Sequence, residues 1–182
     1  MTAPVLHATL VARWQDGAWC GLLLRGPSGA GKSALALRCL EAGWRLVADD
    51  RVLVWASGGR LYGRSHPRLE GLIEARGLGI LPVPHLDWAE IRLAADLVHE
   101  EGAVERMPEA RAVELVGATV PMVALWAHDA AAPAKLALAL SGALACAATP
   151  LGLAAREAYQ APRADTAGQG PDMTPGPLKR NR

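Results

Sequence analysis

The sequence contains no phenylalanine and only three cysteines, and its charges nearly balance, which together narrow the classes of protein it can encode. Cys20, Cys39 and Cys146 are far apart and form no C-x-x-C pair. This argues against a zinc site or a disulfide framework and favours buried thiols in a reducing compartment. The net charge of +1 argues against a dedicated nucleic-acid binder, which carries a strongly basic surface.

Long apolar runs are also missing. The first residues lack the basic start and apolar core of a secretory signal. The most apolar stretch, Leu136 to Ala148, is shorter than the roughly 20 residues that a helix needs to span a bilayer. We therefore expect a soluble cytoplasmic protein that makes no membrane contact.

The chain is long enough for one domain with a proper core, which we place at residues 1–159. Residues 160–182 are rich in proline, glycine and charge and offer little to bury. This composition predicts a disordered C-terminal tail.

The first fifty residues predict a βαβ unit, which points to the α/β class. HATLVARW and AWCGLLLRG read as two strands joined by a turn at QDG. A glycine-rich loop follows, and then SALALRCLEAG has helical spacing with Gly43 as its stop. RLVADD completes the unit as a short strand.

The rest of the chain alternates between clear and ambiguous patterns. VLVWASGGRLYGR predicts a hairpin with its turn at residues 57–59, and RLEGLIEARG after Pro67 predicts a short helix. IRLAADLVHE fits a strand or a helix. ATVPMVALW predicts another strand, and residues 133–148 predict a closing helix.

GPSGAGKS, from Gly26 to Ser33, matches the P-loop pattern G-x-x-x-x-G-K-[ST]. Its glycines let the backbone turn tightly with N–H groups aimed inward, and the helix that follows adds its positive N-terminal end. Lys32 can reach the terminal phosphates and Ser33 can bind Mg²⁺. The alternative is a glycine turn without a ligand. The expected nucleotide-binding residues are Gly26, Pro27, Ser28, Gly29, Ala30, Gly31, Lys32 and Ser33.

Asp49 and Asp50 end the strand RLVADD. In a βαβ unit this strand can lie beside the P-loop strand, so both carboxylates would face one crevice. One can then accept a proton while the other holds a metal or its waters. The alternative is an acidic pair that caps a surface turn.

Three further charged or titratable residues are candidates. Alone, His7 reads as a structural histidine, and Glu74 and Arg76 read as a solvated helix face.

HATLVARW, GPSGAGKSALALRCLEAGWRLVADDRV and PRLEGLIEARGLGILPV occur in this order, and together they resemble the catalytic domain of the bacterial HPr kinase/phosphorylase family. That family joins a P-loop, a strand ending in ADDRV and a signature close to E-x-RGLGI, which ordinary P-loop NTPases lack. The resemblance covers about Leu6 to Leu140. It implies a P-loop domain like that of phosphoenolpyruvate carboxykinase, with a mixed central sheet and flanking helices.

The resemblance further implies a protein-serine kinase that uses ATP and Mg²⁺ to phosphorylate HPr, the phosphocarrier of the phosphotransferase system. Many members also run the reverse phosphorylase reaction with inorganic phosphate. The implied roles are phosphate binding by Lys32 and the loop amides, proton transfer by Asp49, metal support by Ser33, Asp50 and Glu74, and contacts to the phosphates or acceptor by His7 and Arg76.

The sequence departs from longer members in two places. Because the P-loop begins at residue 26, the chain resembles a short form without the additional N-terminal domain. Longer members also carry an arginine, implicated in the reverse reaction, before the last helix. Here the matching stretch, WAHDAAAPAK, has none, which weakens the case for phosphorylase activity. His128 and Asp129 in this stretch are either functional or part of a solvated turn.

Other functions stay open at this level. The chain can be an ATP-binding regulatory module, or a kinase of the same fold with a different acceptor. A homo-oligomer is also an open option.

Overall fold

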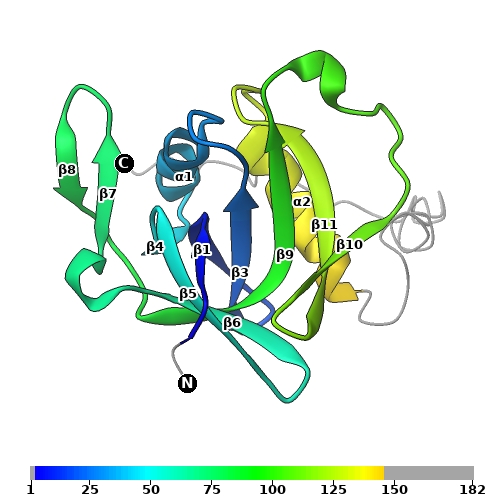
Figure 1. Ribbon diagram of the computed structural model, residues 1–182. Helices are drawn as coiled ribbons and strands as arrows, with labels where there is room; N and C mark the ends of the chain where they lie inside the picture. The colour runs from blue at the N-terminus through cyan, green and yellow to red at the C-terminus, as the bar shows by residue number, and fades with distance from the viewer. Residues whose placement is uncertain (1–2, 146–182) are drawn as a thin grey trace, which may run out of the picture.

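The computed structural model describes residues 3–145, and its main feature is a nine-stranded mixed sheet (Figure 1). Its strands are β1 (Val5–His7), β2 (Thr9–Gln15), β3 (Ala18–Arg25), β4 (Arg45–Ala48), β5 (Arg51–Ser57), β6 (Arg60–Ser65), β9 (Trp88–Val98), β10 (Arg111–Leu115) and β11 (Ala118–Trp126). The strands β7 (Leu72–Ala75) and β8 (Gly79–Pro82) form a separate hairpin. The helices are α1 (Lys32–Glu41) and α2 (Ala132–Ala145), with short 3-10 turns at Pro67–Leu69 and Glu101–Ala103.

The order of the strands is β1-β5-β6-β9-β3-β2-β4, and β11 joins at β9 with β10 beyond it. One edge of β9 pairs with β3, while the other edge pairs first with β6 and then with β11. Where the neighbour changes, Arg92 is an extra residue in β9, because Gly21 pairs with Ile91 and Leu22 with Leu93. Such a bulge bends and twists a strand, which suits a sheet that curls into a half-barrel.

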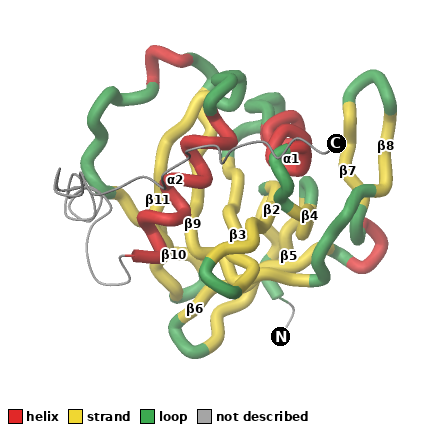
Figure 2. The backbone as a smooth tube through the Cα atoms, turned by 180° about the vertical axis from the view of Figure 1, so that it is seen from behind, coloured by secondary structure: helices red, strands yellow, loops and turns green. Residues whose placement is uncertain are grey.

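The two faces of the sheet bury separate clusters of apolar side chains. Both helices pack on one face, where Leu35 and Cys39 of α1 and Leu136 of α2 join Leu22 of β3. Seen from behind, α2 crosses β9 and β11 (Figure 2). The other cluster holds residues such as Leu23, Val54 and Ile91, so the curled sheet packs against itself there. The expected flanking helices therefore cover one face only.

The strands and the helix expected for the βαβ unit are confirmed, but the expected placement of β4 beside β3 is wrong. β4 pairs with β2, and β2 pairs with β3, both antiparallel. β4 therefore runs parallel to the P-loop strand but does not lie beside it. Its carboxyl end still reaches the same edge of the sheet, as expected.

The helix expected for RLEGLIEARG is wrong. The 3-10 turn ends at Leu69, Gly71 follows with φ +67, and Leu72–Ala75 then forms β7 with Ile73 and Ala75 buried. The hairpin with its turn at residues 57–59 is confirmed as β5 and β6, and IRLAADLVHE is a strand in β9 up to Val98.

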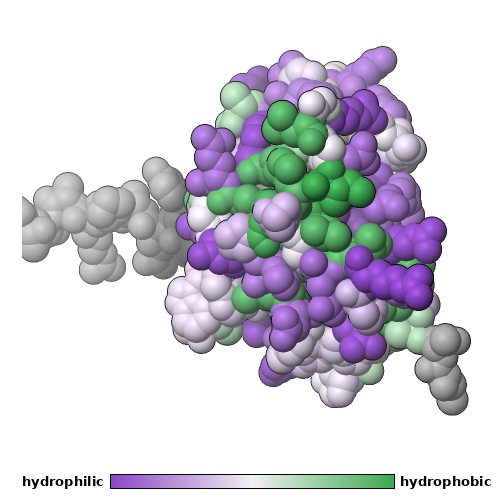
Figure 3. All heavy atoms as spheres, turned by 90° about the vertical axis from the view of Figure 1, so that its left-hand side faces the viewer, coloured by the Kyte–Doolittle hydropathy of each residue, from purple (hydrophilic) through white to green (hydrophobic). Residues whose placement is uncertain are grey.

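Three observations complete the fold. Apolar side chains gather on the face that carries the β7–β8 hairpin, where Leu78 and Ile80 are exposed (Figure 3). Within residues 3–145 no helix is long and apolar enough to cross a membrane. The expected domain boundary at residue 159, the tail at 160–182 and Cys146 lie outside the described residues.

Candidate functional site

The P-loop connects β3 to α1 at the edge of the sheet. Its last glycine, Gly31, has φ +89 and precedes the helix that begins at Lys32. A Cβ at Gly31 would lie 2.9 Å from the Cβ of Ala127 in the β11–α2 loop. Glycine is therefore required here both by the left-handed backbone and by the close approach of another loop.

Lys32 is almost completely buried within the loop. Its Nζ donates hydrogen bonds to the carbonyls of Gly26, at 2.8 Å, and Pro27, at 2.9 Å, and lies 3.5 Å from Nε2 of His7. An isolated buried ammonium would be costly, and these carbonyls offset that cost. The lysine is thus held at the mouth of the backbone nest that would receive an anion.

Asp49 is buried and accepts hydrogen bonds from three segments of the chain. Its Oδ1 accepts from Thr9 at 2.7 Å and from Ser33 at 3.0 Å, and its Oδ2 accepts from the backbone N–H of Glu74 at 3.3 Å. The carboxylate therefore links β2, α1 and β7 around the P-loop serine. It does not line the cavity described below.

Asp50 points elsewhere, although it is the next residue. Its φ of +63 turns the chain sharply, and the N–H of Arg51 bonds back to the carbonyl of Asp49 at 2.7 Å. The exposed carboxylate of Asp50 lies 2.8 Å from Nδ1 of His7. A non-glycine residue in the left-handed region is unusual and is often found at functional sites.

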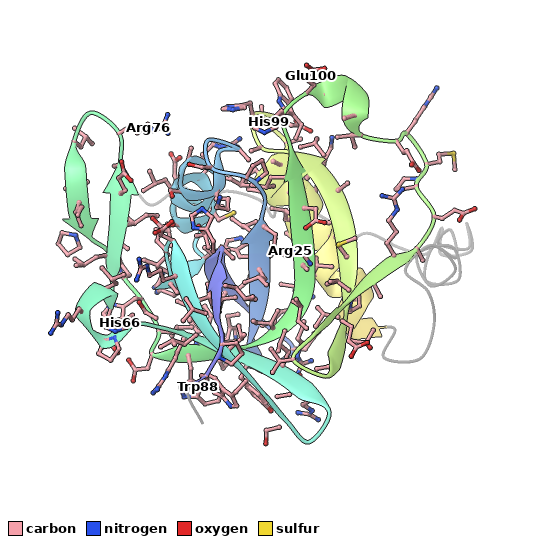
Figure 4. All side chains as sticks on the ribbon, viewed as in Figure 1. Arg25, His66, Arg76, Trp88, His99 and Glu100 are labelled. Atoms are coloured by element: carbon pink, nitrogen blue, oxygen red, sulfur yellow. The ribbon has the colours of Figure 1, made fainter. Side chains whose placement is uncertain are left out.

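A cavity of about 320 Å³ lies over the P-loop. Its lining brings together residues from β1, β2, α1, the β4–β5 turn, the β7–β8 hairpin and the β11–α2 loop. The lining residues include His7, Asp50, Glu74, Arg76 and His128. In Figure 4, Arg76 lies at the end of β7, on the side of the hairpin next to α1. All expected catalytic and metal-binding residues except Asp49 thus face this cavity.

Sequence reasoning missed other residues at this site. Thr9 and the α1 residues Ala34 and Leu37 also line the cavity. Thr9 lies in HATLVARW, one of the segments that carry the family resemblance, and its place two residues after His7 was a usable signal. Asp129 does not line the cavity and instead accepts from the N–H of Ala131 at 2.8 Å, at the start of α2.

The donors around Ser33 fit a magnesium ion. Mg²⁺ prefers oxygen ligands, keeps several waters, and is usually held by one or two carboxylates together with substrate phosphates. Ser33, Asp50 and Glu74 offer side-chain oxygens to the cavity, and Asp49, outside its lining, accepts from the Ser33 hydroxyl. Among residues 3–145 no three acidic, histidine or cysteine side chains form a ready-made metal cluster. The arrangement suits an ion that arrives with a nucleotide.

The family model described as HPr Serine kinase C-terminal domain matches residues 4–125, which includes the P-loop, the acidic pair and the β7–β8 hairpin. The chain belongs to the HPr serine kinase C-terminal domain family. This confirms the resemblance inferred from the three sequence segments.

Curated members of this family match part of the chain. The HPr kinase/phosphorylase of Clostridium beijerinckii is 44% identical over 101 residues, which are 52% of this chain and 32% of that protein. The protein of the same name from Clostridium tetani is 46% identical over 81 residues, or 44% of this chain and 25% of the relative. The one from Streptococcus thermophilus is 38% identical over 114 residues, or 57% and 37%. The chain thus spans between a quarter and two fifths of these relatives.

A solved structure has the same fold. The Hpr(Ser) kinase/phosphatase from Coxiella burnetii superposes with a TM-score of 0.63 at 24% identity, covering 73% of this chain and 86% of that one. The half-barrel sheet with two helices is therefore the fold of this family.

Proposed function

We propose that this chain is an ATP- and Mg²⁺-dependent protein-serine kinase whose acceptor is the phosphocarrier HPr. The observation that carries the proposal is the single cavity that joins the P-loop to Asp50, Glu74 and Arg76, in a chain of this family. A phosphoryl-transfer site needs positioning and charge neutralisation rather than a covalent intermediate. The lining of the cavity supplies Lys32 and Arg76 as cations from separate segments. The carboxylate of Asp50 faces the space where the nucleotide and the acceptor would bind.

The P-loop would hold the nucleotide. The backbone N–H groups of Ser28, Gly29 and Gly31, which line the cavity, and the N-terminal end of α1 would bind the β- and γ-phosphates. Lys32 would exchange its carbonyl partners for phosphate oxygens. Its positive charge would then stabilise the negative charge that develops on the leaving oxygen. Arg76 would approach the transferred group or the acceptor from the hairpin.

The geometry favours Asp50 rather than Asp49 as the proton acceptor, which reverses the roles expected from the sequence. Asp50 faces the cavity, while Asp49 is buried and already accepts three hydrogen bonds. In the forward reaction Asp50 would take the proton from the serine hydroxyl as its oxygen attacks the γ-phosphorus and ADP leaves. His7, 2.8 Å from Asp50, would orient this carboxylate and, together with Lys32, border the phosphates.

Asp49 would position the P-loop serine. A bound Mg²⁺ would neutralise charge on the β- and γ-phosphate oxygens. Ser33 would be its protein ligand, Asp49 would fix the Ser33 hydroxyl, and Glu74 would hold its waters. In the reverse reaction, in which inorganic phosphate attacks phosphoserine, Asp50 would return the proton to the serine oxygen.

The experiment that tests this proposal is intact mass spectrometry of purified HPr after incubation with the protein, ATP and Mg²⁺. We expect one added phosphoryl group on a serine. With Asp50→Asn we expect transfer to fall by about 10² or more while ATP binding persists, because only the proton acceptor is removed.

The outcomes separate the alternatives. ATP binding without added mass on HPr would point to a different acceptor or to a regulatory module. Transfer by Asp50→Asn at the wild-type rate would show that Asp50 is not the proton acceptor, and the same measurement on Asp49→Asn would then test the other carboxylate.

A further inference from the structure

The loop between β11 and α2 is fixed over the P-loop by bonds that do not involve its histidine. Arg38 of α1 donates from Nη1 to the carbonyl of Asp129 at 2.8 Å and from Nη2 to the carbonyl of Ala127. The Asp129 side chain in turn accepts from the N–H of Ala131 and pairs with Lys135. The backbone on both sides of His128 is therefore held to α1 and α2.

This leaves the imidazole of His128 directed at the P-loop. Its Nε2 lies 3.6 Å and its Cε1 lies 3.8 Å from the position that a Cβ on Gly31 would occupy. His128 also lines the cavity, together with Gly29, Gly31 and Lys32. The ring also makes an edge-on contact with Trp126, at 5.7 Å between ring centroids.

A polyphosphate bound in this cavity would accept a further hydrogen bond at the position of His128. The backbone nest and Lys32 would face a bound polyphosphate from inside the loop, and Arg76 reaches the cavity from the β7–β8 hairpin. The acidic groups of the cavity, Asp50 and Glu74, belong to the β4–β5 turn and the hairpin. Among the described residues that line the cavity, His128 is the one that comes from the β11–α2 loop.

We propose that His128 is a phosphate-binding residue of this site, whose ring N–H donates a hydrogen bond to an oxygen of the polyphosphate beside Gly29 and Gly31. The inference rests on the proposed nucleotide binding and adds a ligand contact from outside the P-loop motif. A donor at this place would bind the polyphosphate from the β11–α2 loop, in addition to the amides of the P-loop.

The test is isothermal titration of the full chain with ATP and, separately, with inorganic tripolyphosphate, in the presence of Mg²⁺. For His128→Ala we expect the Kd of both ligands to rise by about tenfold, the usual effect of losing a hydrogen bond to a charged group. His128→Gln keeps an N–H donor and should recover most of the affinity. His99→Ala, at an exposed histidine beyond β9 (Figure 4), is the matched control and should bind as the wild type does.

The outcomes separate this inference from the proposed function. If wild type binds both ligands and His128→Ala binds them equally well, the inference fails while the nucleotide site stands. A loss for ATP but not for tripolyphosphate would place the contact on the nucleoside and also overturn it. If wild type binds neither ligand, the proposed function fails as well. Should His128→Ala unfold, His128→Gln decides, because a phosphate donor is retained there but a ring contact to Trp126 is not.

Discussion

Ser33 in the P-loop and Asp49 at the end of β4 are joined by a hydrogen bond of 3.0 Å. In the sheet, β2 lies between β4 and β3, the strand that leads into the P-loop. The same carboxylate oxygen accepts from Thr9 of β2, the strand that intervenes. Asp49 thus joins the nucleotide loop, the middle strand and the acidic turn. The geometry of the site therefore depends on the folded sheet as well as on the P-loop.

Thr9→Val should destabilise the protein by about 1.5–3 kcal/mol, because it removes a hydrogen bond to a buried carboxylate without changing the side-chain shape. Chemical denaturation of both proteins measures the difference. Thr119→Val, at an exposed position of β11, is the matched control and should leave stability nearly unchanged. Equal effects at the two positions would mean that the Thr9–Asp49 bond contributes little.

Asp49→Asn should separate positioning from proton transfer. The amide oxygen can still accept from Thr9 and Ser33, but the NH₂ group then replaces Oδ2 and meets the backbone N–H of Glu74 donor to donor, so we expect lower thermal stability and a higher Mg²⁺ requirement for nucleotide binding. Asp50→Asn, at an exposed carboxylate, should leave both properties close to wild type. Thermal unfolding and titration of ATP binding with Mg²⁺ check this, and equal behaviour of the two variants would contradict the positioning role of Asp49.

Gly31→Ala should lower both stability and nucleotide binding more than Gly29→Ala does. Both glycines have positive φ, which costs a non-glycine residue about 1–2 kcal/mol. Only at Gly31 does the added Cβ also meet another side chain, Ala127 at 2.9 Å, since the position at Gly29 is open. Thermal unfolding of the two variants and of Gly31→Ala with Ala127→Gly measures the contact. If the second change restores nothing, the approach of the two loops is not the cause.

Lys32→Ala should abolish nucleotide binding, because it removes the cation that the loop holds for the terminal phosphates. Arg111→Ala, at an exposed arginine paired with Glu105, is the control for loss of a positive charge and should bind normally. Calorimetric titration with ATP provides the measurement. Undiminished binding by Lys32→Ala would contradict the P-loop assignment.

Cys39 should make stability depend on alkaline pH. Burial raises the pKa of its thiol to about 12, opposed in part by the charge of Arg38. The native state therefore keeps a proton that the unfolded chain releases above its ordinary pKa of 9.0. Stability from this group is complete below pH 9 and falls as the pH rises towards 12. Denaturation at several pH values should show a smaller alkaline loss in Cys39→Ala, and an identical loss would indicate other groups.

The sequence predicted local features well where a few adjacent residues determine the backbone. The glycine-rich loop, the strand before it and the helix after it form a motif whose chemistry is contained in Gly26–Ser33. The hairpin turn at Gly58 and Gly59 was equally local, because both residues have the positive φ that such turns require.

Features that depend on distant partners were harder to predict. The insertion of β2 between β3 and β4 rests on pairings such as Leu10 with Ala48, which no spacing in the sequence reveals. In RLEGLIEARG the leucines have helical spacing, yet Ile73 and Ala75 are buried as in a strand because β7 pairs with β8 and lies against α1. The roles of the two adjacent aspartates were also not readable, because the left-handed turn at Asp50 sends their side chains in different directions.

The β7–β8 hairpin pairs with no other strand among the described residues, yet it carries Glu74 and Arg76 into the cavity. In the proposed reaction, the hairpin would therefore bring side chains to the transferred group, while the sheet holds the P-loop. A designer who wished to redirect the transferred phosphate to another protein would begin with these few residues.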